Sequence, residues 1–229
     1  MNGVFANRRE AGKRLAHKLA ADANYSQALV LGLPRGGIPV AYEIAKHLHL
    51  PLDVCLVKKI GLPNQPEVAV GAISEAALMH DDSGNSKITI IDADTANRNG
   101  VNQAEIYAAA DRVKADLKWR QDHYRQYRPM IEVRDRIIIL VDDGMATGLT
   151  MHAAITTVRQ QQPQKIILVI PVAANKALQQ LDNLVDDTVC LLIPKSLNAV
   201  GFWYEDFGQI SDQEVCNLLS QSNQTVVSS

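Results

Sequence analysis

The feature of this sequence that most restricts its fold is a series of short apolar runs separated by helical stretches. The runs are rich in Val, Ile and Leu, and the strongest of them are continuous rather than alternating. Continuous runs are typical of parallel strands that are covered on both faces. We predict strands at residues 28–32, 52–57, 68–73, 88–91, 137–141, 166–170 and 188–193.

Helical stretches follow several of these runs directly, at residues 38–48 and 150–161, and another covers residues 7–21. The stretch at 7–21 opens with Asn7-x-x-Glu10, a capping-box pattern. Alternation of strands and helices predicts an α/β fold with a doubly wound, mainly parallel sheet. Because 229 residues suffice for one core of this kind, we expect a single domain over residues 1–229.

Two segments stand outside the alternation. The first is a long amphipathic helix at about residues 100–127, which we interpret as an insertion that packs its apolar stripe on the core. The stripe comprises Ile106, Ala110, Val113, Leu117, Tyr124 and Tyr127. A contact between copies of the chain, giving a homo-oligomer, is the alternative. The second segment, at about 194–220, carries clustered aromatic residues and a helix opened by Ser211-x-x-Glu214, and we expect a small C-terminal hood there.

Composition excludes several classes of protein. The formal net charge is −2, which disfavours a nucleic-acid partner. No run approaches the roughly 18 apolar residues of a membrane span, and the N-terminus has no apolar signal region. The three cysteines are far apart, which indicates neither a disulfide framework nor a zinc site. We therefore expect a cytoplasmic protein with no membrane partner.

A strand-loop-helix segment at residues 137–150 carries the strongest functional signal. Its apolar run ends in Asp142-Asp143, at the carboxyl edge where open α/β sheets bind ligands. Carboxylates accept hydrogen bonds from the hydroxyls of a ribose. Backbone N–H groups of the small residues that follow, and the positive end of the next helix, suit a phosphate. The predicted phosphate contacts are Ala146, Thr147, Gly148, Leu149 and Thr150.

Cationic groups follow two other predicted strands. Arg35 can clamp an anion bidentately, and Gly36-Gly37 lets the backbone approach a diphosphate closely. Lys58-Lys59 ends another apolar run, so we expect both lysines at the ligand-facing edge of the sheet, adding charge for a diphosphate. The turn-rich stretch at 61–67 is expected to be a loop that could close over the site.

The segment from Asp142 to Thr150 resembles the signature of type I phosphoribosyltransferases, which bind phosphoribosyl pyrophosphate (PRPP), and Arg35-Gly36-Gly37 resembles the pyrophosphate loop of that family. The similarity runs from about residue 7 to 215, and its plan resembles stand-alone bacterial phosphoribosyltransferase-like proteins. The resemblance implies transfer of the 5-phosphoribosyl group from PRPP to a nitrogenous acceptor, which we expect to be a nucleobase, with release of diphosphate. It also implies Mg²⁺ that is carried by PRPP rather than by a protein metal site. It implies catalytic roles for Asp142, Asp143, Arg35 and Lys58, with Lys59 as a further PRPP contact.

The identity of the acceptor is not decided by these residues. The stretch from Val200 to Phe207 resembles the hood of hypoxanthine-guanine enzymes, which implies an acceptor pocket of Phe202, Trp203 and Tyr204; an aromatic cluster that joins the tail to the core is the alternative. Ala146, however, stands where those enzymes carry an Asp, so the loop is closer to the adenine and orotate types. A non-catalytic protein that senses PRPP or a nucleotide is the rival function, and the retained Arg35 and lysines favour the enzyme.

Overall fold

The computed structural model describes residues 4–21, 25, 27–62, 65–75, 90–91 and 93–227. The chain packs as two compact units. Unit 1 comprises Met1–Cys55, Tyr124–Gly148 and Gln161–Ser229, and unit 2 comprises Leu56–His123 and Leu149–Gln160. The single-domain organisation stays a prediction.

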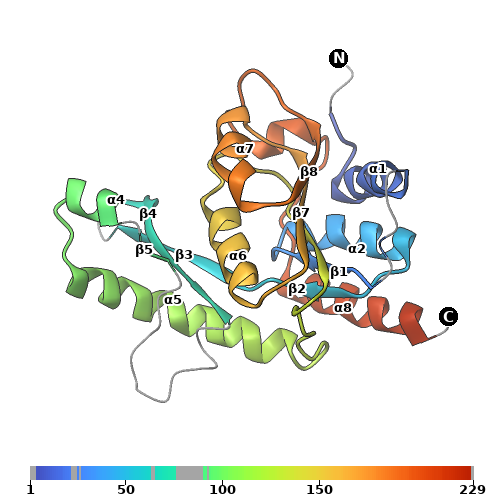
Figure 1. The fold of residues 1–229 in the computed structure, drawn as a ribbon, viewed down its shortest axis with the longest axis horizontal. Coiled ribbons are helices and arrows are strands. Elements are labelled where there is room, and N and C mark those ends of the chain that lie inside the picture. Colours follow the sequence, from blue (N-terminus) through green and yellow to red (C-terminus); the bar gives the residue numbers. More distant parts are fainter. Residues whose placement is uncertain are drawn as a thin grey trace. The chain divides into compact units, whose positions relative to one another are not determined.

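Unit 1 is built on a five-stranded parallel sheet with the strand order β2-β1-β6-β7-β8. Figure 1 shows these strands side by side. Their bounds are Leu52–Val54 for β2, Leu29–Gly32 for β1, Ile137–Val141 for β6, Lys165–Val172 for β7 and Asp187–Leu192 for β8. Every residue of β1 is buried, and so are the last four of β6, as continuous apolar runs predict for strands covered on both faces. The predicted parallel α/β fold is therefore confirmed.

The helices of unit 1 begin where the sequence caps them. The Asn7 side chain accepts a hydrogen bond from the Glu10 backbone N–H at 3.0 Å, at the start of α1 (Arg8–Ala20). The Ser211 hydroxyl accepts one from the Glu214 N–H at 3.1 Å, at the start of α8 (Asp212–Val227). The remaining helices of this unit are α2 (Gly37–Leu48), α7 (Asn175–Leu181), η1 (Asp182–Leu184) and η2 (Val200–Trp203). Helix α2 contacts α1, α8 and β1, so it lies at the centre of its layer.

Unit 2 holds a second sheet, which is antiparallel, with the order β3-β4-β5. Its strands are β3 (Val57–Leu62), β4 (Gln65–Ser74) and β5 (Ile90–Ile91), and its helices are α4 (Ala93–Arg98), α5 (Gln103–Tyr124, the last residue of which belongs to unit 1) and α6 (Leu149–Gln160). The predicted stripe of α5 is buried at Ile106, Ala110, Leu117 and Tyr124, whereas Tyr127 lies beyond the helix and is exposed. Ile106 and Ala110 pack against Ile60 and Val70 of the sheet.

The antiparallel sheet corrects two expectations and bears out part of a third. The run at 52–57 is not one strand, because it contains β2 and, after Cys55 and Leu56, the first residue of β3. The stretch at 61–67 is not a loop, because β3 extends to Leu62 and β4 begins at Gln65; residues 63–64 lie outside the described part. The pairing shifts register on both sides of Gly61, and such a bulge accommodates a glycine inside a strand. Of the strand expected at 88–91, residues 88–89 lie outside the described part and 90–91 form β5.

Candidate functional site

Two loops that are distant in sequence leave the sheet of unit 1 from neighbouring strands. Strands β1 and β6 pair directly, with Gly32 opposite Val141, and the Leu33 N–H donates to the Val141 carbonyl at 2.8 Å. Strand β2 lies beyond β1, and β7 lies beyond β6, so the strand order reverses between β1 and β6. Open α/β sheets bind ligands at the carboxyl end of such a switch point. The loop that carries Arg35 and the acidic pair Asp142-Asp143 both begin there.

The glycines after Arg35 pack directly against the acidic pair. A Cβ atom on Gly36 would lie 2.0 Å from Oδ2 of Asp143, and one on Gly37 would lie 2.9 Å from Cα of Asp142. Real Cβ atoms essentially never make contacts as short as the first of these. Replacing Gly36 by any other residue would therefore force the Asp143 carboxylate to move. The sequence predicts these glycines for the approach of a diphosphate, whereas the contact that requires them within the protein is with the two aspartates.

The two aspartates of the pair occupy different polar surroundings. Asp142 Oδ1 accepts a hydrogen bond from the Asp143 backbone N–H at 2.8 Å. Asp143 Oδ2 accepts one from Nε of Arg8 at 2.7 Å. Burial raises the pKa of Asp142 well above its ordinary value, and the neighbouring Asp143 charge raises it further. Burial also raises the pKa of Asp143, while Arg8 opposes that shift.

Arg8 is a site residue that the sequence does not reveal. Its side chain is 9% exposed, and besides Asp143 it donates from Nη1 to the Gly208 carbonyl at 2.8 Å. The guanidinium carbon lies 3.7 Å from the ring centroid of Phe207, a cation–π contact. Arg8 and Asp143 are 135 residues apart, and no spacing pattern connects an arginine in the first turn of a helix to a distant loop.

The predicted phosphate loop is anchored to β7 through Met145. The Met145 N–H donates to the Val172 carbonyl, and the Ala174 N–H donates back to the Met145 carbonyl, both at 2.9 Å. Ala146 and Thr147 are exposed, and Gly148 has a φ of 77°, in the left-handed region that favours glycine. Within the described part of the chain, no group accepts a hydrogen bond from the backbone N–H of these three residues.

The last two residues predicted to bind the phosphate belong to unit 2. Leu149 and Thr150 form the first turn of α6, where backbone N–H groups have no partner inside the helix. Leu149 is exposed and Thr150 is half-buried. The first turn of a helix is by itself an arrangement that suits an anion.

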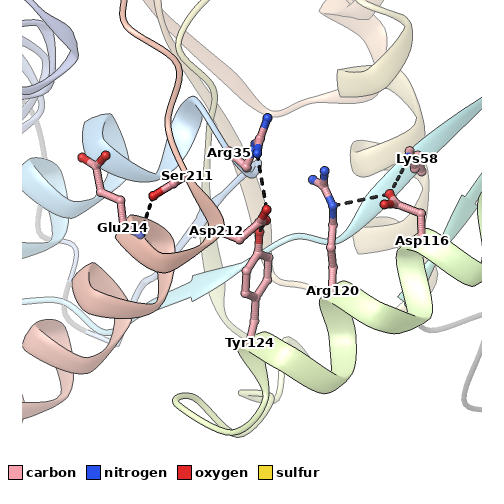
Figure 2. A network of polar contacts seen from close by, with 8 residues as sticks. All are labelled: Arg35, Lys58, Asp116, Arg120, Tyr124, Ser211, Asp212 and Glu214. Carbon is pink, nitrogen blue, oxygen red and sulfur yellow. Dashed lines mark hydrogen bonds and ion pairs between the residues drawn. The ribbon is translucent and has the colours of Figure 1, made fainter.

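Arg35, the cation of the first loop, already has an anionic partner. Figure 2 shows Arg35 and Tyr124 meeting at Asp212, the first residue of α8. Nη1 of Arg35 lies 3.3 Å from Oδ2 of Asp212, and the Tyr124 hydroxyl donates to the other carboxylate oxygen. The peptide bond between Pro34 and Arg35 is cis. A diphosphate that bound Arg35 would compete with Asp212 for its guanidinium.

The two lysines lie inside β3, not at the end of a strand of the parallel sheet, so their predicted placement is wrong. In unit 2, Lys58 pairs with Asp116 of α5, and Nε of Arg120 lies 3.4 Å from the same carboxylate (Figure 2). Successive strand residues point to opposite faces. Lys58 and Lys59 therefore face different sides of this sheet, and their joint contact with PRPP stays a prediction.

The aromatic hood is joined to the N-terminal residues by backbone hydrogen bonds. The Phe5 N–H donates to the Trp203 carbonyl, and the Glu205 N–H donates to the Phe5 carbonyl, both at 2.8 Å. Tyr204 is 5% exposed, and its hydroxyl donates to the Asp143 carbonyl at 2.5 Å. Burial raises the pKa of the Tyr204 hydroxyl, which keeps it protonated as a donor.

The three residues predicted for an acceptor pocket differ in their exposure. Tyr204 packs between Phe5 and Phe207, and the partly buried Trp203 packs against the same cluster. Phe202 is 75% exposed. The surroundings of Tyr204 fit the alternative of an aromatic cluster that joins the tail to the core, and Phe202 is the member whose ring is free to stack on a flat ligand.

Comparison with known proteins identifies the family. The sequence model of the "Phosphoribosyl transferase domain" matches residues 5–205. The chain is 36% identical over 220 residues to a "Putative phosphoribosyl transferase" of Mycobacterium tuberculosis, a match that covers 96% of this chain and 47% of that protein. The chain thus spans about half the length of that relative. The chain belongs to the phosphoribosyl transferase domain family.

Solved structures agree with this assignment. The crystal structure of TT1426 from Thermus thermophilus has a TM-score of 0.80 and 36% identity, covering 95% of this chain and 98% of that one. The AQ2163 protein from Aquifex aeolicus, at 12% identity and a TM-score of 0.50, covers 85% of this chain and 78% of its own, and shares the fold alone. No helix within the described ranges is long and apolar enough to cross a membrane.

Proposed function

We propose that this protein transfers the 5-phosphoribosyl group from PRPP to a nitrogen acceptor, releasing diphosphate. The observation that supports the proposal most is the meeting of the Arg35 loop and the Asp142-Asp143 pair at the switch point between β1 and β6. One loop offers a cation for a diphosphate, and the other offers carboxylates for a ribose. A molecule that carries both groups on one sugar matches that pairing.

The residues would act mainly by positioning the sugar and by stabilising charge. As the bond from C1′ to the diphosphate breaks, the sugar passes through an oxocarbenium-like state. Asp142 and Asp143 would hold the ribose hydroxyls and place negative charge near the developing cation. Arg35 and the Gly36-Gly37 backbone would receive the departing diphosphate. The free N–H groups from Ala146 to Gly148, together with Leu149 and Thr150, would hold the 5′-phosphate.

The site also fits Mg²⁺ that arrives on PRPP. Magnesium dehydrates reluctantly, so it keeps several water ligands and binds substrate phosphates. The diphosphate oxygens of PRPP and water would be its ligands here, while Asp142 and Asp143 hold the ribose. When bound, the metal would neutralise charge on the diphosphate as it leaves.

The test is diphosphate release from PRPP and Mg²⁺ in the presence of each member of a panel of nucleobases and other nitrogen heterocycles. We expect release that depends on one acceptor. Calorimetric titration with Mg²⁺-PRPP alone runs in parallel, because it separates binding from turnover. Binding of PRPP without reaction on any acceptor would overturn the proposed transferase activity and favour a PRPP or nucleotide sensor.

A variant with Asp142→Asn and Asp143→Asn tests the ribose contact. We expect loss of PRPP binding, while free diphosphate, which lacks the ribose, should still bind through Arg35. Asp206→Asn in the hood is a control that removes one exposed carboxylate without touching the pair. PRPP binding by the double variant at the affinity of the unaltered protein would contradict the assignment of the pair to the ribose.

A further inference from the structure

We propose that Arg8 is a positioning residue of the PRPP site, which fixes the Asp143 carboxylate in the orientation that receives a ribose hydroxyl. The inference rests on the proposed function, because it assigns Asp143 to the ribose. Arg8 itself need not touch PRPP. It acts through Asp143, which it contacts at 2.7 Å.

The geometry restrains Arg8 on three sides. Nε is bonded to Asp143, Nη1 to the Gly208 carbonyl at 2.8 Å, and the guanidinium lies over the ring of Phe207. A guanidinium that is held at two of its nitrogens and across its face cannot swing away without breaking several contacts at once. The planar fork of arginine can satisfy both acceptors, which the single ammonium of lysine does less well.

Asp143 is in turn held from several directions. Its carboxylate Oδ2 faces both Arg8 and the backbone at Gly36, and its carbonyl accepts the Tyr204 hydroxyl at 2.5 Å. Asp142 has no ion pair of this kind with any described residue. Arg8 at the start of α1 thus fixes the Asp143 carboxylate, and Tyr204 of the hood fixes the Asp143 backbone, whereas the Asp142 carboxylate accepts the Asp143 N–H.

Charge supports the same role. Asp142 and Asp143 are adjacent and enclosed, and the charge of Asp143 disfavours ionisation of Asp142. The charged groups around Asp143 are Asp142 on its own loop and Arg8 from α1, with the neutral Tyr204 hydroxyl from the hood. Arg8 is the cation that opposes the rise in the pKa of Asp143, so it favours the ionised form of this carboxylate, which accepts a hydroxyl.

The test compares Arg8→Gln and Arg8→Lys with Arg9→Gln. Arg9 is the matched control, because it is the next residue of the same helical turn and pairs with Glu43 at 3.1 Å instead of with the acidic pair. Mg²⁺-PRPP binding is measured by calorimetry from acidic to neutral pH, and folding is checked by thermal unfolding. Arg8→Gln should weaken binding about 10- to 100-fold, the range usual for a residue that orients a direct ligand, while Arg9→Gln leaves it unchanged.

The pH profile separates positioning from a structural role. Without Arg8, the pKa of Asp143 rises further, so PRPP binding should be lost at a higher pH than in the unaltered protein. Arg8→Lys keeps the charge but loses the fork, so its profile should stay close to that of the unaltered protein while its affinity is intermediate. A residue that only supported the fold would lower Tm without moving the profile.

Chemical rescue provides a readout that does not depend on a stable substitution. Arg8 lines a cavity of about 320 Å³ in unit 1, whose other lining residues include Arg9, Pro39 and Glu214. Arg8→Ala would enlarge that space, and added guanidinium ion should enter it and restore PRPP binding at least in part. The same salt should leave PRPP binding by the Arg9→Gln variant unchanged.

The outcomes distinguish this inference from the function on which it rests. Failure of the unaltered protein to bind Mg²⁺-PRPP would overturn the proposed function and the role of Arg8 together. If the unaltered protein binds, and Arg8→Gln is folded and binds with the same affinity and the same pH profile, only the role of Arg8 is overturned.

Discussion

At the scale of single residues, two aspartates that are neighbours in sequence have different charged groups around their carboxylates. Asp143 has a buried cationic partner in Arg8, whereas the largest effect of a neighbouring charge on Asp142 comes from another carboxylate. A buried carboxylate without a cation is costly to ionise, and one with a cation becomes costly when the partner is removed. The two positions should therefore respond in opposite ways to the same Asp-to-Asn substitution.

Asp142→Asn is expected to stabilise the protein at neutral pH. The pKa of Asp142 is raised in the folded state, so its protonated form favours folding, and that contribution is lost as pH rises through the folded-state pKa. Asparagine removes the cost of ionisation and keeps the oxygen that accepts the Asp143 N–H. We expect about 1 kcal/mol of added stability, or roughly 2–4 °C in Tm for a chain of this size, measured by thermal unfolding.

Asp143→Asn supplies the comparison. It leaves the Arg8 guanidinium buried without its anion, and we expect a loss of about 3 kcal/mol, as for other broken buried pairs. The gain at Asp142 should shrink as pH falls through the folded-state pKa and be gone below about 3.9, the ordinary pKa of aspartate, because the unaltered side chain is then protonated in both states. A destabilising Asp142→Asn at neutral pH would show that its charge is favourable in the fold.

At the scale of elements, the apolar runs predict the parallel strands well and the hairpin poorly. The strands of unit 1 follow continuous Val, Ile and Leu runs, and β6 has the predicted bounds. The run at 52–57 fails because the chain leaves one sheet and enters another within it, at Cys55 and Leu56, which stay buried. Periodicity reports that a segment is buried, and it carries no information on the sheet to which the segment belongs.

The loop after β1 should tolerate no side chain at its first glycine. Gly36→Ala would place a Cβ 2.0 Å from the Asp143 carboxylate, so either the loop or the carboxylate must move. We expect lower stability by about 1–3 kcal/mol and weaker PRPP binding. Gly208→Ala is the matched control, because the nearest atom to its Cβ is at 3.4 Å, an ordinary contact. Equal Tm and PRPP affinity in the two variants would show that the loop adapts freely.

The start of α8 should restrain diphosphate binding through Asp212. Diphosphate must take Arg35 from this carboxylate, and a partly exposed pair of this kind contributes up to about 1 kcal/mol. Asp212→Asn should therefore tighten the binding of Mg²⁺-diphosphate by a factor of up to about five, measured by calorimetry. Asp187→Asn, which removes a carboxylate that pairs with Lys165, is the control. Weaker binding in Asp212→Asn would instead mean that Asp212 orients Arg35 for the ligand.

At the scale of the whole molecule, the sequence shows both motifs of the site but not how the chain is divided. The order of the Arg35 loop and the acidic pair along the chain suffices to predict that they share one edge of a sheet, and they do. Arg8 and Asp212 could not be found in this way, because each enters the site through a contact more than a hundred residues distant in sequence. The division into two units cannot be predicted from the sequence for the same reason, since unit 2 is assembled from two separate stretches of chain.

The two tryptophans of the chain report on the two units separately. Trp119 of α5 belongs to unit 2, where it stacks on His123 with ring centroids 5.0 Å apart, and Trp203 of the hood belongs to unit 1. Variants with Trp119→Phe or Trp203→Phe each leave one fluorescent probe. Because helix α5 runs without a break from unit 2 into Tyr124 of unit 1, and Gly148 of unit 1 leads directly into α6, we expect the units to unfold together. Urea unfolding followed through either tryptophan should then give one midpoint, as coincident probes do in a two-state transition.

The far-ultraviolet circular dichroism of both variants, which reports on all helices, is the control for the substitutions themselves. Midpoints that differ between the two probes while circular dichroism shows two steps would mean that the units are separate domains, and would contradict the prediction of one domain over residues 1–229.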